Sequence, residues 1–197
     1  MAVGSPTKTS PLEELQLETE VFVDTRSTEK NGLSQDEKDE LLNYHNEARR
    51  NVNPSASNML AMEWDNELTA TAQGYANQCS WGHNRNLPPN VGETLTYTSH
   101  YNGKNVVNSW VAEKNAYDYT TNKCSSYTCA NYRRVVWATT ALMGCGAKWC
   151  EAFRAVVVVC NYKPSENFAD LRPYKKGESC SDCSSGRTCV NKLFSKQ

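Results

Sequence analysis

Nine cysteines in a chain of 197 residues constrain the fold more than any other feature of this sequence. Cysteines at this density are typical of proteins that are cross-linked by disulfides in an oxidising compartment, because reducing compartments keep thiols free. Cys180 and Cys183 are the only pair with the CxxC spacing of zinc sites, and a single such pair is a weak zinc signal. Since nine is odd, at least one thiol has no partner within the chain. The count therefore predicts a secreted, extracellular protein with several disulfides.

The balance of charge argues against two classes of partner. Lys plus Arg is 21 and Asp plus Glu is 22, so the formal net charge is −1. Nucleic-acid-binding domains and polybasic membrane anchors carry a basic excess instead. The longest apolar run, Ala155 to Cys160, is far shorter than the roughly 20 apolar residues of a transmembrane helix. We therefore expect no nucleic-acid partner and no membrane span.

Composition divides the chain into three parts. Residues 1–33 are rich in Glu, Asp, Pro, Ser and Thr and are expected to form a polar tail, with residues 15–23 as a candidate edge strand. The apolar core of a signal peptide is absent from the first 30 residues, so we interpret the sequence as that of a mature chain. Residues 34–168 have the patterning of a folded domain, and residues 169–197 are expected to form a cysteine-containing extension.

Helical spacing predicts three helices within the domain. Ser34 and Glu37 fit a capping box at the start of the first, and the apolar stripe that follows includes His45. A second helix is predicted after Asp65, and a third over residues 106–119.

Three strands are predicted between and after these helices. Residues 91–97 form a short strand, and residues 142–150 and 154–162 are separated by a hairpin-length turn. The run from 155 to 159 is apolar on both faces, which indicates a central strand covered on both sides. The fold class that follows is an α/β, three-layer α-β-α sandwich with a mixed or antiparallel central sheet, plus a disulfide-linked C-terminal extension.

Four motifs follow one another in the domain: HNEAR at 45–49, GETL at 92–95, NYRRVVWATT at 131–140 and VCNYKP at 159–164. In order and spacing they resemble the signature segments of the CAP superfamily, which comprises cysteine-rich secretory proteins, venom allergens and plant pathogenesis-related proteins. Residues 53–83 are similar to its animal secretory branch, and the cysteines of the extension resemble the hinge of that branch. The resemblance covers about residues 34–168 and implies the same α-β-α sandwich.

The resemblance also implies a central cleft in which two His and two Glu converge, here His45, Glu93, Glu113 and Asn131. Asn131 stands where the family has its second His, and Arg133 and Arg134 replace a Thr-Gln pair. A carboxamide is a poorer zinc donor than an imidazole, so we expect no cofactor, with zinc at His45 as the alternative. We expect His45 to be a core histidine, hydrogen-bonded to a carboxylate such as Glu93 or Glu113, rather than a metal ligand. Asn46 and Arg49 are expected to fix the first helix to the sheet by hydrogen bonds.

No catalytic residue is assigned, because no Ser or Cys of the motifs has a second His nearby to activate it. We expect a secreted, non-enzymatic binding or effector protein whose partner is an extracellular protein or a lipid or sterol. Some members of the family bind sterols or lipids through the loop that corresponds to residues 117–129. The alternative is a metal-dependent hydrolase, a protease, that uses His45, Glu93 and Glu113.

The disulfide pairing is likewise taken from the resemblance. It implies four bridges: Cys79–Cys150, Cys145–Cys160, Cys124–Cys129 and Cys180–Cys189. Phe194 stands where the family hinge has a further cysteine, which leaves Cys183 unpaired. A disulfide-linked dimer through Cys183 is the functional interpretation of that leftover thiol.

Overall fold

A computed structural model describes residues 28–165, 170–182 and 186–196 of the chain. Its middle layer is a four-stranded sheet built, in spatial order, from β1 (Glu63–Trp64), β5 (Leu142–Cys150), β6 (Ala155–Lys163) and β2 (Gly92–Thr98). β1 runs parallel to β5, whereas β5 with β6 and β6 with β2 are antiparallel, so the sheet is mixed.

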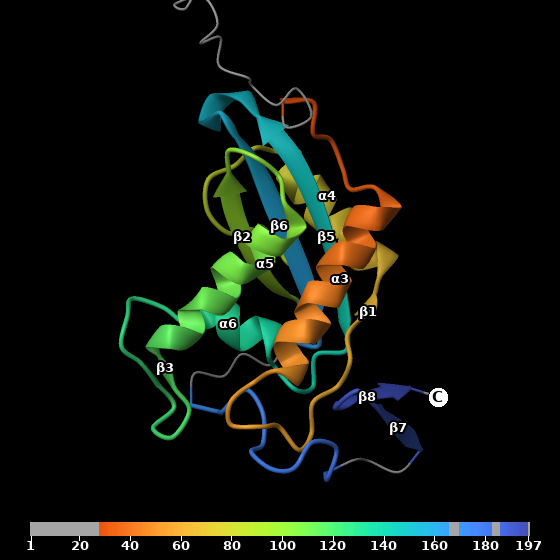
Figure 1. The fold of residues 1–197 in the computed structure, drawn as a ribbon. Helices are drawn as coiled ribbons and strands as arrows, with labels where there is room; N and C mark the ends of the chain where they lie inside the picture. The colour runs from red at the N-terminus through yellow and green to blue at the C-terminus, as the bar shows by residue number, and fades with distance from the viewer. Residues whose placement is uncertain (1–27, 166–169, 183–185, 197) are drawn as a thin grey trace, which may run out of the picture.

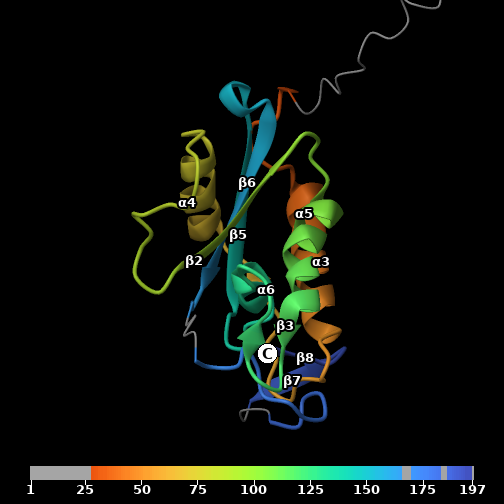
Figure 2. The same cartoon turned by 90° about the vertical axis from the view of Figure 1, so that its left-hand side faces the viewer.

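Helices cover both faces of this sheet (Figures 1 and 2). α4 (Asn66–Ala76) lies on one face, and α3 (Gln35–Arg50) and α5 (Gly103–Val111) lie on the other. α6 (Ala130–Val135) packs against α5 and β2. β6 is buried from Val156 to Tyr162, as expected of a strand covered on both sides. The predicted α-β-α sandwich with a mixed sheet is confirmed.

The first helix begins at the predicted capping box. The backbone N–H of Glu37 donates to Ser34 Oγ at 3.3 Å, and the N–H of Ser34 donates to Glu37 Oε2 at 2.8 Å. Two N–H groups that have no intrahelical acceptor are thereby satisfied. The buried face of α3 carries Leu41, His45 and Arg49, which confirms that His45 belongs to the apolar side.

The third helix differs from the prediction over residues 106–119. α5 starts earlier, because the side chain of Asn102 caps it by accepting from Asn105 N at 2.9 Å. It ends at Val111 and continues as the 3-10 helix η1 (Ala112–Ala116). The chain then extends into β3 (Tyr117–Asp118), which pairs with β4 (Lys123–Cys124). The helical periodicity of residues 106–119 did not reveal that the chain leaves the helix after Ala116 and pairs as a short strand with β4.

Two glycines of β5 allow α4 to lie directly on the sheet. A Cβ at Gly144 would lie 2.3 Å from the backbone N of Thr69, and one at Gly146 would lie 2.4 Å from the Cα of Gln73. Real Cβ atoms do not approach backbone so closely, so this helix can pack here only over glycine.

Residues 30–32, which were predicted to belong to the polar tail over residues 1–33, pair with the sheet. Trp149 N donates to Lys30 O at 2.8 Å, and Gly32 N donates to Ala147 O at 2.7 Å, so this segment pairs with β5. This pairing satisfies backbone N–H and C=O groups near the end of β5, which the two-residue strand β1 does not reach. A polar composition does not reveal it, since the contacts use no side chain. The predicted edge strand over residues 15–23 lies outside the described residues.

The C-terminal extension packs against the domain. Its hairpin consists of β7 (Arg187–Val190) and β8 (Leu193–Lys196). Phe194 N donates to Met59 O at 2.9 Å, and Ala61 N donates to Phe194 O at 2.7 Å. Phe194 is only 2% exposed. At the position where the family hinge has a cysteine, this chain therefore has an aromatic side chain that fills the junction.

The structure contains the four disulfides that the resemblance implies: Cys79–Cys150, Cys124–Cys129, Cys145–Cys160 and Cys180–Cys189. Cys145 and Cys160 are directly opposite each other on β5 and β6. Cys183 lies outside the described residues, so its state stays a prediction. Within the described ranges, no helix has the length and apolarity to cross a bilayer.

Candidate functional site

His45 is buried in a chain of hydrogen bonds through the core. Its Nδ1 lies 2.7 Å from Leu41 O, and its Nε2 lies 2.9 Å from the hydroxyl of Tyr162. Because a carbonyl only accepts, Nδ1 carries the proton and Nε2 accepts from Tyr162. The Tyr162 hydroxyl then accepts from Thr94 Oγ1 at 2.8 Å. Both ring nitrogens are occupied, and the partner is a phenol instead of the carboxylate that we expected for a core histidine.

The reason lies in the alternation of side chains along β2. Thr94 is directed to the α3 side of the sheet, where it meets Tyr162, so the preceding residue, Glu93, is directed away from His45. A pairing of His45 with Glu113 is not found either, because both oxygens of Glu113 bind α6.

The free energy of unfolding should depend on pH through His45. Burial lowers the pKa of His45 from 6.5 to about 4. The unfolded chain therefore takes up this proton before the folded one does, and acid favours unfolding between these two values. We expect a loss of about 3 kcal/mol from this group between pH 7 and pH 4. Urea unfolding measures this decrease in the free energy of unfolding. For His45→Gln the decrease between pH 7 and pH 4 should be smaller than for the native protein by that amount. For the control His100→Gln, which replaces an exposed histidine, the decrease should equal that of the native protein. An unchanged pH dependence in His45→Gln would contradict this assignment.

The other polar residues of the first motif join α3 to the segments around it. The Asn46 amide donates to Met62 O at 3.0 Å and accepts from Met62 N at 2.8 Å. The guanidinium of Arg49, 1% exposed, donates to five backbone carbonyls at 2.7–3.2 Å: those of Leu60, Val135, Trp137, Ala138 and Thr140. Both residues therefore fix the first helix by hydrogen bonds as expected, but to α6 and to segments before β1 and β5 and not to the strands of the sheet.

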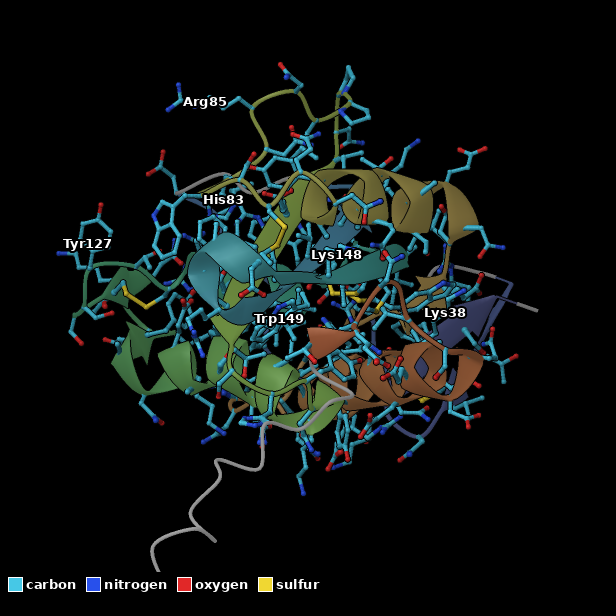
Figure 3. All side chains as sticks on the ribbon, turned by 90° about the horizontal axis from the view of Figure 1, so that it is seen from above. Lys38, His83, Arg85, Tyr127, Lys148 and Trp149 are labelled. Carbon is cyan, nitrogen blue, oxygen red and sulfur yellow. A yellow bond between two sulfur atoms is a disulfide. The ribbon has the colours of Figure 1, made fainter. Side chains whose placement is uncertain are left out.

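Glu93 is paired with His83 and not with His45. His83 Nδ1 donates to Glu93 Oε1 at 3.0 Å, and the backbone N–H of Asn84 donates to the same oxygen at 2.9 Å. Glu93 is buried, whereas His83 is 60% exposed on the loop between α4 and β2 (Figure 3). The histidine that the structure brings to the second motif is therefore one that the four motifs did not include.

The loop that carries His83 is held by two tyrosines. Tyr75 donates its hydroxyl to Gly82 O at 2.9 Å, and Gly82 N donates to the hydroxyl of Tyr97 at 2.9 Å. Gly82 has φ +91°, a backbone conformation that residues with a side chain rarely adopt. The sequence signal that could have identified His83 is this Gly-His pair, ten residues before the Gly92-Glu93 pair.

Glu113 and Asn131 do come together, as the resemblance implies. The Asn131 amide donates to Glu113 Oε1 at 2.9 Å, and the backbone N–H of Tyr132 donates to Oε2 at 3.0 Å. η1 thus presents the carboxylate to the first turn of α6. Asn131 acts here as a hydrogen-bond donor, which is the opposite of what a metal ligand does.

Arg134 connects the two carboxylates electrostatically. Burial lowers the pKa of its guanidinium, while the negative charges of Glu93 and Glu113 act in the opposite direction. Its Nε is buried next to Gly92, whose added Cβ would lie 3.3 Å away. No direct ion pair joins it to either carboxylate in the part of the chain described. We call His83, Glu93, Glu113, Asn131 and Arg134 the carboxylate cluster.

The carboxylate cluster does not fit a metal ion. Across residues 28–165, 170–182 and 186–196, no group of three or more His, Cys, Asp or Glu side chains is placed to hold one. Both oxygens of Glu113 and one oxygen of Glu93 already accept hydrogen bonds from the protein. His45, the candidate ligand, has no free ring nitrogen.

A separate pocket of about 330 Å³ lies where the end of α3 meets η1, β3 and α6. Apolar side chains and two aromatic rings contribute to its wall, and its polar residues include an exposed lysine, Lys114. Its lining residues are Ala48, Asn51, Val52, Asn53, Val111, Lys114, Tyr117 and Tyr132. Of the loop over residues 117–129, for which lipid contact was expected, only Tyr117 lines it, and Tyr127 projects outward (Figure 3). We call this the helix pocket.

Comparison with known proteins agrees with this fold. Peptidase inhibitor 16 of Mus musculus is 39% identical over 171 residues, which are 82% of this chain and 34% of that protein. The chain thus spans about a third of that relative's length. GLIPR1-like protein 1 of Homo sapiens is 35% identical over 169 residues, which are 79% of this chain and 69% of that protein.

Solved structures and a family model point the same way. Venom allergen-like protein 4 of Schistosoma mansoni superposes with a TM-score of 0.64 and 25% identity, covering 77% of this chain and all of that one. The family model described as "CAP: Cysteine-rich secretory protein family" matches residues 42–162, more than half of the 197 residues. The chain therefore belongs to the CAP family of cysteine-rich secretory proteins.

Proposed function

We propose that this chain is a secreted, non-enzymatic binding protein that takes one amphipathic lipid, such as a fatty acid, into the helix pocket. The pocket itself carries the proposal. Its volume of about 330 Å³ is within the range of small-molecule sites. Val52 and Val111 offer apolar surface to an acyl chain, and the exposed Lys114 can pair with a carboxylate.

Secretion is supported by two observations. The structure contains four intrachain disulfides, which persist in oxidising compartments and are rare in the cytosol. The matching family is described as one of cysteine-rich secretory proteins.

The geometry does not favour the hydrolase alternative. A metalloprotease requires ligands with free lone pairs and an open metal position, whereas His45 and Glu113 are fully engaged with protein partners. The term "peptidase inhibitor" belongs to a relative of which this chain spans about a third, so inhibition is not carried over to it.

Palmitate should bind the native protein with a stoichiometry of one, and Val111→Phe should weaken binding at least about tenfold, because the larger ring occupies the helix pocket. Lys114→Gln should weaken palmitate about two- to fivefold, since an exposed ion pair contributes little, and should leave its methyl ester unaffected. Isothermal titration calorimetry measures all three affinities.

Val190→Phe is the matched control, because Val190 is 58% exposed on β7 and does not line the pocket. Melting temperatures of both phenylalanine variants check that they fold. The proposal fails if palmitate does not bind saturably, or if folded Val111→Phe binds as tightly as Val190→Phe.

A further inference from the structure

Donors of this chain already bind three of the four carboxylate oxygens of the carboxylate cluster. Glu113 accepts from the side chain of Asn131 and from the N–H of Tyr132, at 2.9 and 3.0 Å. Glu93 accepts from His83 and from the N–H of Asn84, at 3.0 and 2.9 Å. Both oxygens of Glu113 and Oε1 of Glu93 are therefore engaged by hydrogen bonds, whereas Glu93 Oε2 is buried without a hydrogen-bond partner in the described structure.

A positive charge is also present within electrostatic range of both carboxylates. Arg134 extends from α6 over Gly92, the residue before Glu93, and its Nε is buried. The neighbouring Arg133 takes another direction, because its guanidinium donates to Leu171 O at 2.6 Å and lies near the ring of Tyr117. Of these two adjacent arginines, only Arg134 is aimed at the cluster.

Both residues concerned are departures from the family pattern. Asn131 stands in place of a histidine, and Arg134 stands in place of a glutamine. One change removes a metal ligand and supplies a donor to Glu113. The other places a guanidinium next to Gly92, within electrostatic range of Glu93 and Glu113.

We propose that Asn131 and Arg134 together take the place of a divalent cation in the carboxylate cluster, so that the native chain leaves Zn²⁺ unbound there. Two substitutions, Asn131→His and Arg134→Gln, should convert the cluster into a zinc site. The first supplies an imidazole beside Glu113, and the second removes the charge that repels the metal. This inference does not depend on lipid binding in the helix pocket, because the two sites share no lining residue.

Calorimetric titration with ZnCl₂ at neutral pH tests the inference on the full chain. The Asn131→His/Arg134→Gln variant should take up one equivalent of zinc, at least about a hundredfold more tightly than the native protein. Zinc should raise the melting temperature of that variant and leave the native value unchanged. Adding Glu113→Gln to the double variant should abolish uptake, which separates the cluster from exposed histidines.

Arg133→Gln is the matched control, because it removes the same charge from the same helix. If the double variant does not melt cooperatively, Arg134→Gln alone should still bind zinc at least about tenfold more tightly than Arg133→Gln. Two results would overturn the inference. One is stoichiometric zinc binding by the native protein that Glu113→Gln abolishes. The other is a folded variant, double or Arg134→Gln, that binds zinc no more tightly than Arg133→Gln.

Discussion

Replacing Arg49 with methionine is expected to lower the free energy of unfolding by at least about 4 kcal/mol, since each buried acceptor left without a donor costs roughly 1–3 kcal/mol. The Arg49 guanidinium supplies all five of its N–H donors to carbonyls of Leu60 and of residues 135–140. Methionine fills a similar volume but donates nothing. A loss of this size is a large part of the 5–15 kcal/mol that typically stabilises a domain.

Urea unfolding at neutral pH measures the loss, and Arg50→Met is the matched control. Arg50 is the next residue of α3, is only half-buried, and has an Nε without a partner in the described structure. Arg49→Lys separates charge from geometry, because an ammonium has three donors and cannot satisfy five carbonyls. We expect it to be nearly as destabilising as methionine. The assigned role of Arg49 is wrong if Arg49→Met lowers the free energy of unfolding no more than Arg50→Met does.

Phe194→Ala should undock the C-terminal hairpin, because it empties a buried aromatic site at a cost of about 3–5 kcal/mol. Phe194 lies between the hairpin and residues 59–61, which it also binds through its backbone N–H and C=O. Local opening then becomes easier than global unfolding. Hydrogen exchange at the Ala61 and Phe194 amides should accelerate by at least about a hundredfold.

The exposed Val190 on the partner strand provides the comparison for Phe194. Val190→Ala removes an apolar side chain that is 58% exposed and should leave both exchange rates near their native values. The Cys180–Cys189 disulfide is present in both variants, so it does not distinguish them. Equal exchange in Phe194→Ala and Val190→Ala would show that Phe194 does not hold the extension in place.

Local sequence signals predicted most of the architecture. Ser34 and Glu37 form the predicted capping box, and Asp65 caps α4 by accepting from Leu68 N. The run of apolar residues on both faces identified β6 as a central strand. These features depend on neighbouring residues, and so a single sequence contains the information.

Contacts made through loops and backbone were not predictable in the same way. The pairing of His83 with Glu93 depends on the course of a long loop, and the pairing of residues 30–32 with β5 uses only backbone groups. The choice of His45 as the cleft histidine followed from its motif and its place on the buried face of a helix. Because His45 is buried on that face, its two ring nitrogens bind Leu41 and Tyr162 and neither binds a carboxylate.

We propose that palmitate binds in the helix pocket and not at the carboxylate cluster. Two-dimensional amide NMR of the full chain titrated with palmitate distinguishes the two sites, since it locates the site as well as detecting binding. We expect saturable shifts centred on Val52, Val111 and Tyr117, with the amides of Gly92 and Glu93 unchanged. Shifts centred on His83, Glu93 and Asn131, or no saturable shift at all, would contradict it.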